Sequence, residues 1–216
     1  MRRAMSRAKV FGIGLNKTGT TTLGVCLSRL GYRHCSFDLS LLEQVRHGDL
    51  KGLRAVVDRH DSFEDWPYPM VFEQLDHLYP GSRFILTRRR SARAWLRSLQ
   101  EHSLRTDPAI GSRSRTLAYG WPYPQLNPRA HLSLYRAHLL RVRHYFRQRP
   151  QDLLEVCWEE QASWAPLCSF LGQPLPGVPF PHANPGCCGS RQRLLHNQEL
   201  IRRGFDDALG DDVALP

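Results

Sequence analysis

Five consecutive residues, Lys17–Thr21, combine one cation, one glycine and three hydroxyl groups in a single short segment. The apolar segment Lys9–Leu15 precedes them and is typical of a buried parallel strand. Apolar residues at helical spacing follow as far as Gly31. A glycine-bearing turn between a strand and a helix exposes backbone N–H groups and the positive end of the helix dipole. This segment therefore predicts an anion-binding site.

The hydroxyl groups around Gly19 exceed what the start of a helix requires, because one threonine is enough to cap a helix. Here Thr18, Thr20, Thr21 and Thr22 surround the glycine, and Lys17 can reach the oxygens of a bound phosphate. We therefore expect these residues to bind a phosphate-like group rather than only to cap the helix.

The order of the residues differs from that of a nucleoside-triphosphatase loop, which reads GxxxxGK[ST]. Asn16 stands where that loop has the glycine before its lysine, and Gly19 follows the Lys-Thr pair instead. A Mg-ATP enzyme also needs an acidic residue to place its metal, but the strand expected at Arg83–Thr87 leads into arginines. A kinase with a degenerate loop therefore remains the weaker alternative.

The order Lys-Thr-Gly-Thr-Thr is similar to the phosphosulfate loop of sulfotransferases that use PAPS (3′-phosphoadenosine-5′-phosphosulfate). The resemblance implies that Lys17, Thr18, Gly19, Thr20 and Thr21 bind the 5′-phosphosulfate of this co-substrate. It also implies metal-independent, in-line transfer of a sulfuryl group to a hydroxyl or amine, with Lys17 neutralising the leaving phosphate. Stretches between Phe63 and Thr87 and between Trp164 and Asn184 resemble a bacterial branch of this family.

The same resemblance implies a second site, for the 3′-phosphate, made of an arginine after a later strand and a serine eight residues on. Arg90 and Ser98 have this spacing, with Trp95 between them. The usual Arg-Asp-Pro of the family is replaced here by Arg88-Arg89-Arg90. We expect Arg90 and Ser98 to bind the 3′-phosphate, and the sequence leaves Arg88 and Arg89 as alternatives.

A base that removes the proton of the acceptor would assist the transfer. Branches of the family use a histidine or a carboxylate, and three residues qualify by their position after the loop: His60, Asp61 and Asp65. Asp65 lies in a Phe-x-Asp-x-Pro segment and is the preferred candidate. His60 and Asp61 remain open as alternatives.

Strands and helices alternate along the chain, which predicts an α/β fold: a single domain with a central parallel β-sheet flanked by helices, a P-loop NTPase-like three-layer sandwich. Strands are expected at 9–15, 83–87 and 153–157. Helices are expected at 41–58, 70–79, 92–100, 127–149, 164–171 and 192–208, besides the one that follows the threonines. The single domain would span 1–216, with a basic tail at 1–8, a flexible loop at 102–127, and a C-terminal helix and tail at 187–216.

The formal charge of +10 comes almost entirely from arginine, since lysine occurs only at Lys9, Lys17 and Lys51. Arginine suits oxyanions, so a basic nucleic-acid-binding module is a further alternative. Such a module needs aromatic residues interleaved with arginines on one sheet face, and no expected strand has this pattern. We therefore expect a small-molecule or glycan acceptor and no nucleic acid, while the oligomeric state stays open.

The remaining features concern location and metals. The six cysteines form no CxxC pair and no zinc-ligand spacing, which favours reduced thiols and no metal site. No apolar stretch approaches the roughly 18 residues of a membrane span, and no signal-type apolar segment follows the basic N-terminus. The sequence therefore predicts a cytoplasmic protein.

Overall fold

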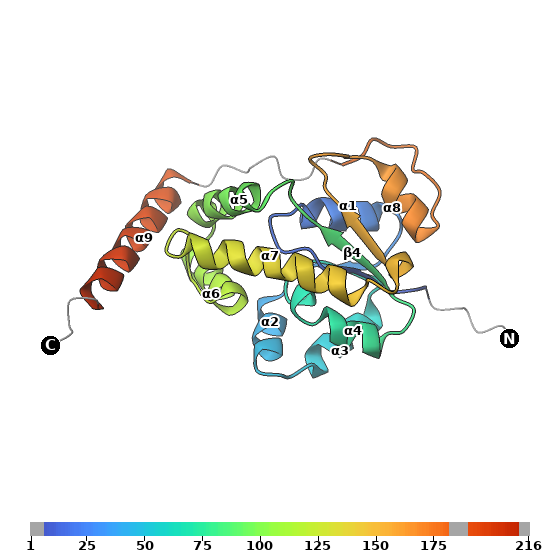
Figure 1. Cartoon of the computed structure of the whole chain (residues 1–216), viewed down its shortest axis with the longest axis horizontal. Coiled ribbons are helices and arrows are strands. Elements are labelled where there is room, and N and C mark those ends of the chain that lie inside the picture. The colour runs from blue at the N-terminus through green and yellow to red at the C-terminus, as the bar shows by residue number, and fades with distance from the viewer. Residues whose placement is uncertain (1–6, 182–189, 212–216) are drawn as a thin grey trace. The chain divides into compact units, whose positions relative to one another are not determined.

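A five-stranded parallel sheet forms the centre of the computed structural model, which describes residues 7–181 and 190–211 (Figure 1). Its strands are β1 (Val10–Gly12), β2 (His34–Cys35), β3 (Ser62–Phe63), β4 (Arg83–Thr87) and β5 (Leu153–Val156). They lie in the order β2-β3-β1-β4-β5, and every neighbouring pair is parallel. The predicted strands near residues 9, 83 and 153 are confirmed. Strands β2 and β3 were not predicted, because two residues carry no periodic signal.

Side chains alternate between the two faces of the sheet, and both faces are buried. Phe11 and Phe84 belong to one apolar cluster, whereas their neighbours Val10 and Ile85 belong to another. Since successive residues of a strand point to opposite faces, each cluster must be covered by its own layer of helices. The predicted parallel α/β fold, with helices on both faces of one sheet, is therefore confirmed.

Two sets of helices provide these layers. Figure 1 shows α1 and α8 together on one side of β4, and α3 and α4 on the other side. The nine α-helices of the described residues are α1 (Thr20–Arg29), α2 (Leu39–Arg46), α3 (Lys51–Arg59), α4 (Phe72–Leu78), α5 (Ala92–Arg105), α6 (Pro108–Tyr119), α7 (Pro128–Tyr145), α8 (Trp164–Leu171) and α9 (Arg191–Asp211). Two short 3-10 helices, Tyr68–Met70 and Pro150–Asp152, complete the described elements.

The chain divides into two compact units. Unit 1 lies within residues 1–90 and 138–185 and contains the whole sheet, while unit 2 lies within residues 91–137 and 186–216 and is helical. Inside unit 2, Trp95 of α5 stacks on Tyr135 of α7, with ring centroids 4.6 Å apart. Asn197 of α9 donates to the carbonyls of Leu104 and Thr106 at 3.0 and 3.1 Å, which ties α9 to the end of α5. A single domain over 1–216 stays a prediction.

The prediction of a flexible loop at 102–127 is wrong, because much of this segment is helical. Helix α5 continues to Arg105, and α6 fills much of the remainder. The side chain of Asp107 caps α6 by accepting from the N–H groups of Ala109 and Ile110, and Gly120 ends the helix at φ 85°. These caps define a helix that has no clear apolar period.

The helix predicted at 41–58 is divided in two. Helices α2 and α3 are separated by Gly48, which has φ 80° and cannot continue a right-handed helix. No helix among the described residues is long and apolar enough to cross a membrane. Residues 1–6, most of the predicted N-terminal tail, lie outside the described part of the chain.

Candidate functional site

The turn that follows β1 is held close to the end of β4. A Cβ atom added to Gly14 would lie 2.1 Å from Oγ1 of Thr87, so only glycine allows this approach. Thr18 closes the turn, because its hydroxyl donates to the carbonyl of Leu15 at 2.6 Å and lies 2.6 Å from Oγ1 of Thr87. The hydroxyl of Thr18 therefore holds the loop onto the sheet, and its predicted contact with a ligand stays a prediction.

Three side chains from distant parts of the chain bind the backbone of this loop. Arg89 donates to the carbonyl of Lys17 at 2.7 Å, and the indole of Trp158 donates to the carbonyl of Gly19 at 3.2 Å. His138 contacts the carbonyl of Ile13 at 2.7 Å. Burial lowers the pKa of His138 to about 4, so the neutral ring uses its Nε2 proton for this bond at neutral pH. The loop is thus fixed before any ligand binds.

Helix α1 begins at Thr20 without a side-chain cap and with no acidic residue in its first turn. Gly19 precedes it at φ 94°. Thr20 and Thr22 are buried at 3% and 8% exposure, whereas Thr21 is exposed. The first turn of α1 thus offers unpaired backbone N–H groups next to the hydroxyl of Thr21 and the half-buried Lys17. That these groups bind an anion stays a prediction.

The three arginines after β4 have different surroundings. Arg88 binds Glu155 at 2.7 Å and Glu160 at 2.9 Å, and Arg89 binds Glu159 at 2.7 Å. The side chain of Arg90 is exposed, and within the described residues it makes no ion pair or hydrogen bond. Only its backbone N–H is engaged, donating to Glu159 at 2.9 Å. Arg90 is thus the member of this run whose guanidinium is open to solvent, and its contact with a ligand stays a prediction.

The alternative bases, His60 and Asp61, lie before β3, whereas the loop lies after β1. Because these strands are parallel and adjacent, the two positions belong to opposite edges of the sheet. Asp61 is also bound by two of the guanidinium nitrogens of Arg33, Nε and Nη2, at 2.8 and 2.9 Å, which lowers the pKa of Asp61 to about 2. Such a carboxylate is a poor proton acceptor, since Brønsted behaviour favours a base with a pKa nearer the working pH.

Asp65 follows β3 and therefore lies on the same edge of the sheet as the loop after β1. It accepts from the N–H of Trp66 at 2.7 Å. Burial and the neighbouring charge of Glu64 raise the pKa of Asp65, and the positive charge of Lys17 opposes this rise. The charges of Lys17 and Asp65 thus act on each other, and both residues lie on the edge of the sheet that carries the loop after β1. The role of Asp65 as a base stays a prediction.

Ser98, the predicted partner of Arg90, lies on α5 and is partly buried. It belongs to unit 2, whereas Arg90 ends unit 1. Its pairing with Arg90 rests on the sequence spacing and stays a prediction. The stretch 182–189, which includes part of the resemblance near the C-terminus, lies outside the described residues.

Trp158 and the glutamates that pair with the arginines were missed by sequence reasoning. Glu155 is 67 residues from Arg88 along the chain, and no local pattern links the two. Trp158 precedes Glu159 and Glu160 in the turn after β5, so one segment both covers Gly19 and neutralises the first two arginines. Among the described residues, no three His, Cys, Asp or Glu side chains are grouped so as to hold a metal ion.

Comparison with known proteins agrees with the geometry of the loop. The profile of a family described as "Sulfotransferase domain" matches residues 9–186, which is most of the chain. The chain is also 30% identical over 213 residues to "Ava biosynthesis cluster protein M" of Aspergillus versicolor, an alignment that covers 81% of this chain and 80% of that protein. Because this match extends over most of its length, the chain belongs to the sulfotransferase family.

Proposed function

We propose that this protein transfers a sulfuryl group from PAPS to a hydroxyl or amine of a small-molecule acceptor, without a metal. Membership of the family supports sulfuryl transfer in general. The observation that carries the choice of co-substrate is the charge distribution after the two central strands. Lys17 and the uncapped start of α1 follow β1, and Arg90, whose side chain has no ion pair within the described residues, follows β4, the strand next to it.

For the 5′ end of the co-substrate, Lys17, Thr18, Gly19, Thr20 and Thr21 are the proposed contacts. Backbone N–H groups at the start of a helix bind anions well, because the helix dipole favours negative charge there. The loop needs no rearrangement to do so, since Thr87, Arg89 and Trp158 already hold it. Preorganised donors stabilise charge without a reorganisation cost at the moment of reaction.

For the 3′ end, Arg90 is the proposed contact, with Ser98 from the sequence spacing. Arg88 and Arg89 are each paired with a glutamate, so their charges are largely neutralised within the protein. Arginine binds a phosphate with two parallel hydrogen bonds, and such bonds are about twice as strong as neutral ones. This phosphate distinguishes PAPS from ATP, so Arg90 would determine which nucleotide is accepted.

For the transfer itself, Asp65 is the proposed base and Lys17 the proposed electrophilic group. Asp65 takes the proton of the acceptor hydroxyl as the new S–O bond forms. Lys17 neutralises the phosphate oxygen that is left when the S–O bond of the co-substrate breaks. Burial raises the pKa of Asp65 toward the working pH, which suits a general base.

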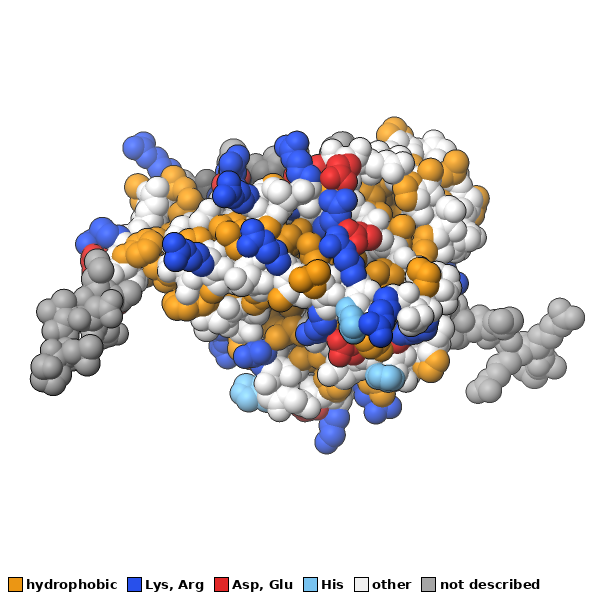
Figure 2. All heavy atoms as spheres, in the orientation of Figure 1, with side chains coloured by type: hydrophobic (Ala, Val, Ile, Leu, Met, Phe, Trp, Pro, Cys, Tyr) orange, Lys and Arg blue, Asp and Glu red, His pale blue; other side chains and the backbone are white. Residues whose placement is uncertain are grey.

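The two other functions are not favoured. A magnesium-dependent kinase is not favoured because the strand next to the loop, β4, leads into arginines rather than an acid. A nucleic-acid-binding module would need a continuous basic surface, but acidic side chains lie among the basic ones on the face shown in Figure 2, and many arginines are ion-paired. A bacterial branch and a cytoplasmic location remain predictions.

Isothermal titration of the full chain tests the choice of nucleotide. We expect 3′,5′-ADP to bind in the presence of EDTA, and Lys17→Ala to weaken this binding on the order of 10-fold or more, as for loss of a charged hydrogen bond. ATP is titrated with and without magnesium as the comparison. Binding of ATP that depends on magnesium, together with no binding of 3′,5′-ADP, would contradict the proposal.

A further inference from the structure

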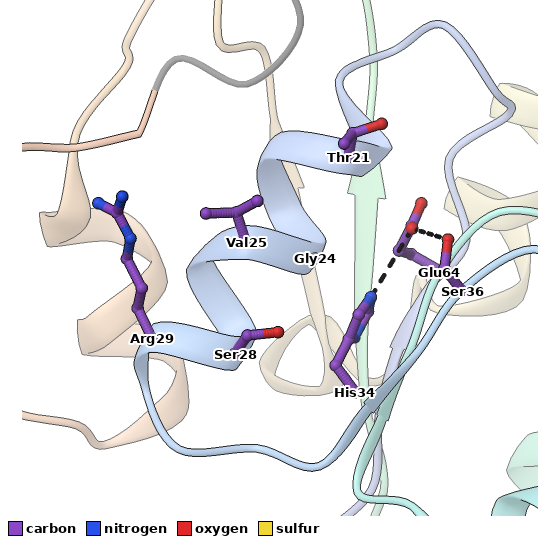
Figure 3. A pocket seen from close by; sticks show the side chains of 8 residues that line it. All are labelled: Thr21, Gly24, Val25, Ser28, Arg29, His34, Ser36 and Glu64. Atoms are coloured by element: carbon purple, nitrogen blue, oxygen red, sulfur yellow. Dashed lines mark hydrogen bonds and ion pairs between the residues drawn. The ribbon is translucent and has the colours of Figure 1, made fainter.

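A cavity of about 430 Å³ lies in unit 1 between helix α1 and the segments that follow and form β2 and β3 (Figure 3). Thr21, in the first turn of α1, lies at one end of it, so the cavity begins at the anion-binding loop. Gly24 and Val25 of α1 form part of its wall. Opposite them are the polar side chains of His34, Ser36 and Glu64.

Glu64 is the most buried polar group of this cavity, with an exposed fraction of 3%. One carboxylate oxygen accepts from the hydroxyl of Ser36 and lies 3.7 Å from Nε2 of His34. The other oxygen, Oε2, is buried and has no hydrogen-bond partner among the described residues. In Figure 3 it points away from both Ser36 and His34. A buried carboxylate oxygen without a partner is costly, so a donor from a ligand would relieve it.

The position of this carboxylate is fixed by its neighbours. The Nδ1 atom of His34 is 2.9 Å from the hydroxyl of Ser62 in β3. A Cβ atom added to Gly24 would lie 2.6 Å from Nε2 of His34, so glycine at 24 lets the ring pack against α1. Glu64 is thus held between Ser36 and a histidine ring that is itself held from two sides. A ligand group would meet a preorganised acceptor.

The basic side chain nearest to Glu64 is His34, at 3.7 Å, and no lysine or arginine of the described residues forms an ion pair with Glu64. Arg29 lines the same cavity, but Figure 3 shows its guanidinium pointing away from Glu64. Arg29 donates instead to the carbonyl of Pro179 at 3.2 Å. A second carboxyl, that of Asp65, follows Glu64 directly in the chain. A buried carboxylate with no lysine or arginine partner, next to a second carboxyl group, favours a positively charged ligand.

We propose that this cavity binds the protonated amine of the acceptor, and that Glu64 is the residue that recognises it. The inference rests on the proposed function in one respect, since it takes the molecule bound between Thr21 and Glu64 to be the acceptor. The acceptors of this enzyme are then small molecules that carry an ammonium group as well as the group to be sulfated. An ammonium donates up to three hydrogen bonds and suits the unpartnered oxygen of Glu64 better than a neutral hydroxyl does.

The test uses two probes that differ only in this group, trans-4-aminocyclohexanol and its neutral counterpart trans-4-methylcyclohexanol. Each is titrated into the full chain saturated with 3′,5′-ADP, and ligand-observed NMR gives the dissociation constants. We expect the amine to bind about 10-fold more tightly than the methyl compound, the usual effect of one charge-assisted hydrogen bond. Equal affinities, or no saturable binding of either probe, would overturn the proposal.

Two variants locate the preference. Glu64→Gln keeps an oxygen for Ser36 but removes the charge, and we expect it to bind both probes with equal affinity. Glu101→Gln, an exposed position of α5, removes the same charge elsewhere and should leave the preference intact. A preference for the amine that survives Glu64→Gln in a folded protein would refute the role of Glu64.

The nucleotide titration separates this inference from the proposed function. If 3′,5′-ADP does not bind, the proposed co-substrate is wrong. The two probes are then compared on the nucleotide-free protein, where we again expect Glu64 to favour the amine. If 3′,5′-ADP binds and the preference for the amine is absent, the proposed function stands and the inference about the acceptor fails.

Discussion

Lys17 and Asp65 are the two non-glycine residues with a positive φ in the described part of the chain, at 67° and 65°. Each follows the end of a strand, β1 for Lys17 and β3 for Asp65, and these strands are parallel neighbours. A positive φ costs a residue with a side chain on the order of 1–2 kcal/mol, and such residues cluster at functional sites. The protein thus holds Lys17, proposed to neutralise the leaving phosphate, and Asp65, the proposed base, in strained conformations on one edge of the sheet. Their charges act on each other.

The first prediction concerns Asp65. Asp65→Asn keeps the acceptor for the N–H of Trp66 but removes the base, so we expect kcat to fall on the order of 10²–10⁴-fold. Turnover is measured as release of 3′,5′-ADP from PAPS with a panel of hydroxylated and amine-bearing small molecules. Asp61→Asn is the control, because Asp61 is bound by Arg33 away from the loop, and its turnover should stay near that of the wild type. A loss smaller than 10-fold for Asp65→Asn would reject Asp65 as the base.

The same substitution has a second expected effect, on stability. The pKa of Asp65 is higher in the folded than in the unfolded protein, so the folded state binds more protons between the two values. The free energy of unfolding therefore falls as the pH rises through this window. Asparagine does not ionise, so the variant avoids this loss of stability. We expect Asp65→Asn to unfold at a higher temperature than the wild type at pH 7 and at the same temperature near pH 3, by calorimetry. A lower melting temperature at pH 7 would contradict the burial of this charge.

A third prediction separates the arginines. We expect Arg90→Ala to weaken the binding of 3′,5′-ADP on the order of 10–100-fold. The binding of 5′-AMP should hardly change, since only 3′,5′-ADP has a 3′-phosphate. Arg88→Ala is the matched control: its charge is already paired with Glu155 and Glu160, so the preference for 3′,5′-ADP should be unchanged. The reverse result would assign the 3′-phosphate to Arg88.

A fourth prediction concerns Gly19. A Cβ atom there would lie 2.4 Å from the indole of Trp158, and the residue has φ 94°. Gly19→Ala should displace Trp158, destabilise the protein by about 1–3 kcal/mol and weaken nucleotide binding. Gly31→Ala is the control, because Gly31 has φ 79° but nothing within 4 Å of the added atom. If both variants lose the same stability and affinity, contact with Trp158 has no role in shaping the loop.

A fifth prediction divides the threonines of the loop by their surroundings. Thr18→Val removes a buried hydroxyl that binds Leu15 and leaves Thr87 without this partner, so stability should fall by about 1–3 kcal/mol. Thr21→Val changes an exposed residue, so it should leave the melting temperature unchanged and weaken the binding of 3′,5′-ADP instead. Denaturant unfolding and titration of both variants check this division. An unchanged stability of Thr18→Val would show that its hydroxyl does not hold the loop.

The parts of the fold with strong local signals could be predicted from the sequence. The apolar segments of β1 and β4, the helix after the threonines, and the long helix opened by Asn127 and Pro128 are of this kind. Strands β2 and β3 are only two residues long, and their existence depends on pairing, of β3 with β1 and of β2 with β3. Helix α6 is defined by its caps, Asp107 and Gly120, rather than by an apolar stripe.

The candidate site was predictable where its residues are consecutive, as in Lys17–Thr21. It was not predictable where distant segments decide a role. Glu155 in β5 and Glu159 after it show which arginines are neutralised, and no local pattern joins these glutamates to the arginines after β4. A role for Glu64 was not predicted, because its surroundings depend on Ser36 and His34. Pairing of the two-residue strand β2 with β3 brings these residues close to Glu64.

The most direct test of the whole account is the contribution of the adenosine 3′-phosphate to affinity, measured as the ratio of the dissociation constants of 5′-AMP and 3′,5′-ADP without metal. We expect this ratio to be on the order of 10–100, if Lys17 and the start of α1 bind one end of the nucleotide and Arg90 the other. A ratio near one would mean that nothing in this protein recognises the 3′-phosphate, and PAPS would then not be its co-substrate.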